Sequence, residues 1–133
     1  MTEEEMLREV TRARRANIVI FCVFAALFAA AAIGWFVYRH QHTFTQEKWM
    51  NRPEHRVDIV DDMLAKYRVI GMTEEEITAL LGGDDGKYAR YSPEEDSIVY
   101  YLGPERGLFS IDSEWLVITF RSGAVSDYTV RTD

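Results

Sequence analysis

An uninterrupted apolar segment near the N-terminus constrains this sequence more than any other feature. Residues 18–38 read IVIFCVFAALFAAAAIGWFVY, in which Gly34 is the one residue outside the apolar class. A helix rises about 1.5 Å per residue, so this segment spans roughly the 30 Å hydrocarbon core of a bilayer. Lipid offers no hydrogen-bond partner to an open backbone, so a spanning segment must be helical. We predict a transmembrane helix over residues 18–38.

Basic residues near the two ends of this segment indicate its orientation. Arg12, Arg14 and Arg15 precede it, whereas Arg39 alone follows it closely. Positively charged flanks are retained in the cytoplasm. The bias therefore predicts a cytoplasmic N-terminal segment over residues 1–17 and an extracytoplasmic C-terminal domain, in a protein that crosses the cell membrane once. The lipid bilayer is then its first partner.

Two other interpretations of the apolar segment stay open. A buried helix of a soluble protein would have to be wrapped by the rest of a short chain, which holds too little apolar material for it. Cleavage as a secretory signal is the stronger competitor, because Ala29–Ala32 supply the small residues of a cleavage site. The apolar character continues through residues 33–38, which suits an anchor better.

The rest of the chain is acidic. Residues 1–17 hold four acidic and four basic residues, so the other 18 of the 22 acidic residues and 11 of the 15 basic residues lie after residue 38. An acidic domain argues against nucleic acid as a partner, since phosphate backbones attract basic surfaces. The single cysteine, Cys22, excludes an internal disulfide.

Residues 39–52 are expected to form a juxtamembrane connector, and residues 53–133 one small domain. The apolar residues that recur at helical spacing in its first part are Val57, Val60, Leu64 and Tyr67. This spacing predicts an amphipathic helix over residues 54–69. Thr73 lies three residues before Glu76, a capping pattern that predicts a second helix from Glu74.

The second half of the domain is rich in β-forming residues. A polar loop is expected over residues 84–96. After it come three strand-like runs, residues 97–102, 115–120 and 124–131. This order predicts an α+β domain of two helices packed on a three-stranded antiparallel sheet.

One block of the domain resembles a known family. It consists of Gly71-Met72-Thr73, Glu75-Glu76-Ile77 and Leu80-Leu81-Gly82, followed by Tyr-Tyr-Leu-Gly and Leu-Val-Ile-Thr-Phe strands. Together these are similar to the SmpA/OmlA (BamE) domain over about residues 57–130. The resemblance implies two helices on one face of a three-stranded sheet. It also implies a binding role in the bacterial cell envelope, because the best-known members are lipoproteins that support assembly of β-barrel proteins without being enzymes.

No set of residues is arranged for catalysis. Cys22 lies inside the apolar segment, and the sequence has neither a nucleophile-elbow pattern nor a glycine-rich phosphate loop after a strand. We therefore expect no enzymatic activity, no cofactor and no metal site. His40, His42 and His55 leave open a pH sensor, because histidine titrates near neutral pH.

The predicted sheet has a second apolar face that two helices cannot cover. Side chains alternate along a strand, so Trp115 and Val117 point away from Leu116 and Ile118. The candidate protein-binding patch comprises Val99, Tyr101, Trp115, Val117 and Val125. Alternatively, other parts of the chain fold over it. The residues able to do so are Phe44 and Trp49 of the connector, and Leu108, Phe109 and Ile111 of a loop.

These expectations together describe a membrane-anchored, non-enzymatic interaction or scaffold module outside the cytoplasm. Its partner would be another envelope protein docked on the aromatic patch. The alternative is a secreted or periplasmic ligand-binding or inhibitor domain, released by cleavage at the alanines.

Overall fold

A computed structural model describes all 133 residues, which form two compact units, residues 1–40 and 41–133. The first consists of the helix α1 (Glu3–Gln41), about 58 Å long at the standard rise. No residue of α1 is buried, so α1 is not packed as a core helix within this chain. By length and composition the helix can cross a membrane, a test that an N-terminal signal sequence also passes.

The helix α1 begins well before its apolar segment because the sequence supplies an N-terminal cap. The Glu5 amide donates to the Thr2 hydroxyl at 3.3 Å, and the Thr2 amide donates to the Glu5 carboxylate at 2.9 Å. This reciprocal pair satisfies two backbone donors that the first turn leaves open. The acidic side chains at Glu3 and Glu4 also face the positive end of the helix dipole.

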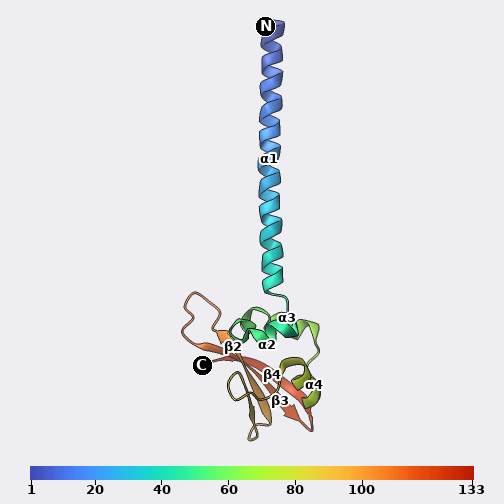
Figure 1. The fold of residues 1–133 in the computed structure, drawn as a ribbon, viewed down its shortest axis with the longest axis vertical. Helices are drawn as coiled ribbons and strands as arrows, with labels where there is room; N and C mark the ends of the chain where they lie inside the picture. Colours follow the sequence, from blue (N-terminus) through green and yellow to red (C-terminus); the bar gives the residue numbers. More distant parts are fainter. The chain divides into compact units, whose positions relative to one another are not determined.

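Residues 41–133 fold into an α+β unit with short helices against an antiparallel sheet (Figure 1). The helices are α2 (Gln46–Asn51), the 3₁₀-helix η1 (Pro53–Asp58), α3 (Val60–Lys66) and α4 (Glu74–Leu81). The strands are β1 (Ala89–Ser92), β2 (Ser97–Pro104), β3 (Ser113–Arg121) and β4 (Ala124–Thr132). They form one sheet in the order β1-β2-β3-β4, with every neighbouring pair antiparallel.

The sheet has four strands and not the expected three. The additional strand, β1, lies inside the stretch predicted to be a polar loop, residues 84–96. Ala89 and Tyr91 alternate with polar residues, but the run is only four residues long and lies within a polar stretch. The strand is fixed instead by pairing, Ala89 opposite Tyr100 and Ser92 opposite Ser97.

The single helix predicted over residues 54–69 is also wrong. The structure has η1 and α3 there, separated at Ile59, and the chain is extended again at Tyr67. Val57 and Val60 of the predicted stripe are buried, and so are Ile59 and Met63, whereas Tyr67 is 41% exposed. Arg56 also lies inside the unit, at 4% exposure.

Residues 41–52, expected as a connector, belong to the compact unit. The Thr45 hydroxyl accepts a hydrogen bond from the Lys48 amide at 3.2 Å and so caps α2. Phe44 and Trp49 are buried in the core, and the Trp49 indole donates to the Leu81 carbonyl at 3.0 Å.

Two sequence predictions within this unit are confirmed. The Thr73 hydroxyl accepts a hydrogen bond from the Glu76 amide at 3.2 Å, and α4 begins at Glu74. The expected core face of the sheet is buried beneath the helices. Its members on β2 and β3 are Ile98, Tyr100, Leu102, Leu116, Ile118 and Phe120.

Candidate protein-binding surface

Four of the five predicted patch residues share the sheet face that points away from the helices. Strand pairing sets Val99 opposite Val117 and Tyr101 opposite Trp115, and paired residues lie on the same face. None of the four belongs to the hydrophobic cluster that the helices and the sheet share. Val117 is buried at 4% exposure, and the other three are half-buried. We call these four residues and their neighbour Tyr88 the aromatic face.

Val125 does not belong to the aromatic face, contrary to the prediction. It pairs with Phe120, is 3% exposed and joins the core cluster on the opposite side of the sheet. The cause is a register shift between Thr119 and Phe120, which reverses the alternation expected along β4. A bulge of this kind leaves no pattern in the sequence.

Three aromatic rings run in a row across the strands of this face. The rings of Tyr88 and Tyr101 are 5.9 Å apart, and those of Tyr101 and Trp115 are 5.2 Å apart at an interplanar angle of 67°. Tyr88 reaches the row because its carbonyl accepts from the Tyr101 amide, which continues the β1–β2 ladder by one residue. The row gives the face a rigid, amphipathic centre.

Neither of the segments expected to cover the patch does so. Phe44 and Trp49 lie in the core on the other side of the sheet, where Trp49 contacts Tyr100 edge to face. Leu108 and Phe109 of the β2–β3 loop are 97% and 80% exposed, so they cover nothing. Neither segment therefore closes off the aromatic face, where Tyr88, Tyr101 and Trp115 remain partly exposed.

Two hollows flank Trp115 on this face. The larger has a volume of about 630 Å³ and the smaller about 280 Å³. Val99 and Trp115 line both of them. The other lining residues are Arg90, Tyr91, Ser92, Pro93 and Glu94 in the larger, and Arg131, Thr132 and Asp133 in the smaller. The larger hollow has the volume of a typical small-molecule or side-chain pocket.

Two exposed arginines frame the aromatic face in an otherwise acidic unit. Arg90 pairs across the sheet with Val99, and Arg131 pairs with Trp115. Both side chains are exposed. Two polar atoms of the same face, Ser97 Oγ and Trp115 Nε1, are buried without a hydrogen-bond partner. The surface thus combines apolar area with positive charge, as binding surfaces do.

Arg56 supports this face from the helix side, and sequence reasoning did not single it out. Its Nε donates to the Trp49 carbonyl at 2.8 Å, and its Nη1 donates to the Tyr101 carbonyl at 3.1 Å and the Tyr88 carbonyl at 3.3 Å. The guanidinium also lies 4.7 Å from the centre of the Trp49 ring. Burial lowers the pKa of Arg56, with Asp85 opposing that shift. Arg56 thereby holds together the two strands that carry the tyrosines.

The structure shows no arrangement for metal binding. No group of three or more His, Cys, Asp or Glu side chains is placed to hold an ion. Asp84 and Asp85 bind their own loop instead, since one Asp85 oxygen accepts from the amides of Lys87, Tyr88 and Ala89. A hollow of about 710 Å³ lies beside this loop and is lined by Arg56, Asp85 and Tyr88 among others.

Comparison with known proteins adds no relative from which to transfer a function. No family model, no curated protein and no solved structure matches the chain. The geometry of residues 41–133 is therefore the basis on which a function is argued.

Proposed function

We propose that this chain is a single-pass membrane protein whose residues 41–133 act outside the cytoplasm as a non-enzymatic interaction module of a bacterial cell envelope. The observation that carries this proposal is the aromatic face, a row of three partly exposed rings with two hollows beside Trp115. Aromatic residues and arginine are the types most enriched where proteins bind one another. The resemblance to the SmpA/OmlA domain supports the same role.

The partner that fits this surface is a polypeptide segment of another envelope protein. The hollow between β1 and Trp115, about 630 Å³, accommodates a large apolar side chain. Arg90 and Arg131 can bind a carboxylate or a backbone carbonyl of the same segment, because arginine is a strong hydrogen-bond donor to both. An aromatic or aliphatic side chain next to an acidic residue is the expected motif.

The anchor in this proposal is α1. Its apolar residues are exposed throughout, and bilayer hydrocarbon is the environment in which such a helix is stable. Three arginines precede the apolar segment and one follows it, a bias that supports a cytoplasmic N-terminus. A thiol introduced at Ser126 in a Cys22→Ala chain should react with a membrane-impermeant maleimide from outside. Labelling of a thiol introduced at Thr2 instead would show that the N-terminus lies outside and the C-terminal unit inside.

Site-specific photocrosslinking in intact membranes tests the interaction. A photoreactive residue at Thr129, which pairs with Val117 on the aromatic face, should capture one defined protein. The same residue at Ala79, exposed on α4, should not. Capture at Thr129 should disappear in a Trp115→Thr chain. Equal capture at both positions, or capture that survives Trp115→Thr, would contradict docking on this face.

A second candidate function rests on Ala29–Ala32. Cleavage there would release residues 41–133 with a complete core, as a secreted or periplasmic ligand-binding or inhibitor domain. Mass spectrometry of the mature N-terminus separates the two functions. An intact N-terminus supports the anchored module, whereas a chain that begins after the alanines supports the released domain.

A further inference from the structure

The loop between β2 and β3 exposes the most apolar surface of residues 41–133. Leu108, Phe109 and Ile111 are 97%, 80% and 86% exposed. Elsewhere in this unit no large apolar side chain exceeds 46%. Three such residues within four consecutive positions form a continuous apolar tip, which is costly to leave in water. Figure 1 shows this loop, in orange, as an open excursion from the sheet.

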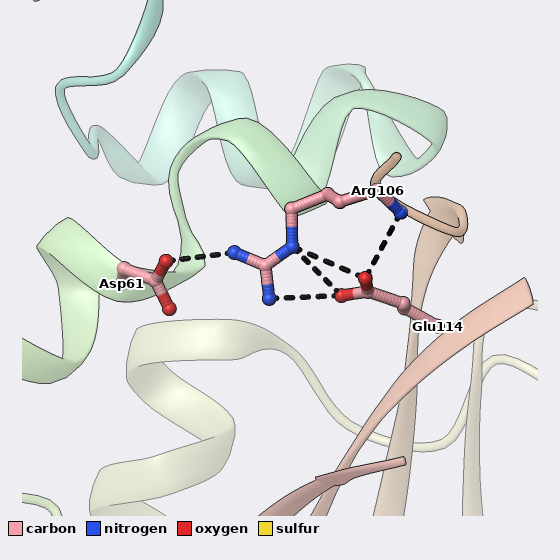
Figure 2. A network of polar contacts seen from close by, with 3 residues as sticks. All are labelled: Asp61, Arg106 and Glu114. Carbon is pink, nitrogen blue, oxygen red and sulfur yellow. Dashed lines mark hydrogen bonds and ion pairs between the residues drawn. The ribbon is translucent and has the colours of Figure 1, made fainter. Parts of the chain in front are cut away.

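The base of this loop is held by a network of charged side chains. The Arg106 guanidinium lies between Glu114 of β3 and Asp61 of α3, at 2.9 Å and 2.7 Å (Figure 2). The Arg106 amide also donates to Glu114 at 3.0 Å, and the Glu105 amide donates to the Asp112 carbonyl at 2.8 Å. The apolar tip therefore projects from a fixed stalk.

The stalk lies at the end of the unit where the chain arrives from α1. Asp61 contacts Arg106, and the next residue, Asp62, accepts a hydrogen bond from the Phe44 amide at 2.6 Å. Phe44 is six residues after Tyr38, the last residue of the apolar segment, so it lies within about 20 Å of that residue along an extended chain. The headgroup zone adds several ångströms on each side of the hydrocarbon.

We infer that the tip formed by Leu108, Phe109 and Ile111 inserts into the interfacial zone of the same bilayer that holds α1. This inference rests on the proposed membrane anchor. The occupant is lipid because the anchor confines the tip within reach of a bilayer, at a high effective concentration. Glu105, Asp112 and Asp61 around the base disfavour anionic headgroups, so insertion depends on apolar contact and occurs in zwitterionic lipid.

Spin-label accessibility in phosphatidylcholine nanodiscs that hold one full-length chain tests this inference. In a Cys22→Ala background, nitroxides are attached at Ser110→Cys in the tip, Ser126→Cys on the edge strand β4 and Phe28→Cys within α1. The label at 110 should be about five-fold or more less accessible to a water-soluble nickel relaxant than the label at 126. Leu108→Ser with Ile111→Ser should restore its accessibility.

The outcomes separate this inference from the membrane anchor. Equal nickel accessibility at 110 and 126, with 28 protected, would overturn tip insertion and leave the anchor standing. A label at 28 open to nickel would overturn both. Protection at 110 that appears only when each disc holds several chains would show that a second copy covers the tip, which also overturns insertion into lipid.

Discussion

At the scale of single residues, Arg56 shows how a charged side chain can connect two layers of this small domain. Its guanidinium is buried, yet its hydrogen bonds to Trp49, Tyr88 and Tyr101 all end on backbone carbonyls. Buried carbonyls need partners, and one planar, multidonor group supplies several at once. Lysine has a single nitrogen and cannot reproduce this geometry.

Replacing Arg56 should therefore destabilise the fold. Arg56→Met should lower the free energy of unfolding by about 2–3 kcal/mol, because the carbonyls of Trp49 and Tyr101 lose the Arg56 donor and the Tyr88 carbonyl keeps only the Tyr101 amide. Urea unfolding of the full chain in detergent micelles measures this change. Arg68→Met, at an exposed position, should change it by less than about 0.5 kcal/mol. Equal effects of the two variants would contradict the role of Arg56.

Trp115 should matter for binding far more than for folding. It is half-buried and lies outside the core cluster, so Trp115→Thr should abolish partner capture while the far-ultraviolet circular dichroism of the chain is retained. Tyr67→Thr, at another partly exposed aromatic residue, should leave capture intact. Loss of the folded state in the Trp115 variant would show that the aromatic face is core.

Alternation along the strands predicted some residues of the aromatic face correctly and one incorrectly. Alternation correctly placed Val99, Tyr101, Trp115 and Val117 together, because no register shift intervenes between them. It misplaced Val125, which lies beyond the bulge in the β3–β4 pair. Arg56 escaped notice because an arginine within an amphipathic pattern normally faces water.

At the scale of elements, the β2–β3 connection depends on one ion-pair network. Burial alone would raise the pKa of Glu114, but hydrogen bonds from the side chain and amide of Arg106 outweigh burial and lower it. The hydrogen bond from Lys66, together with that from the Phe44 amide, also lowers the pKa of Asp62. Both carboxylates are thus bound in their ionised form.

Stability should consequently fall in acid. A carboxylate whose pKa is lowered by folding stabilises the native state above its unfolded pKa, about 4.5 for Glu114, and this contribution is lost as the pH drops through the folded value. Glu114→Gln should lower the free energy of unfolding by about 2 kcal/mol at pH 7. The variant should also lose less stability than the original chain when the pH falls below 4.5. Urea unfolding across this range measures both. Glu75→Gln on α4 is the control and should leave the dependence of stability on pH unchanged. The same unchanged dependence in Glu114→Gln would contradict the network.

A glycine sets how closely β2 approaches η1. Gly103 has a φ of +127°, and a Cβ there would overlap the carbonyl oxygen of Glu54. Gly107 has a φ of +140° with nothing nearby. Both changes to alanine strain the backbone, but only Gly103→Ala should also push two elements apart, which adds about 1–3 kcal/mol of destabilisation. Urea unfolding of the two variants measures this difference. Equal destabilisation by Gly103→Ala and Gly107→Ala would contradict the close contact.

Elements differed in how far the sequence could predict them. The start of α4 was predicted correctly because Thr73 and Glu76 act locally, within one turn. The break at Ile59 and the strand β1 depend on contacts with distant segments, such as Arg56 with Tyr101 and Ala89 with Tyr100. Local patterns therefore predicted one long helix and a loop where the structure has two short helices and a strand.

At the scale of the whole molecule, the chain combines an exposed apolar helix with an acidic domain that has its own core. The sequence was sufficient to predict this division, since residues 18–38 differ in composition from everything around them. It placed the start of the domain at residue 53, whereas the compact unit begins at residue 41. The difference arises because Phe44 and Trp49 are isolated aromatics in a polar stretch, yet both are buried in the core.

Alkaline carbonate extraction of membranes, with the chain tracked by mass, tests whether α1 anchors this protein in a bilayer. We predict that the intact chain stays in the membrane pellet and enters solution only with detergent, because the exposed apolar surface of α1 requires hydrocarbon. Recovery of the intact chain in the carbonate supernatant would contradict it.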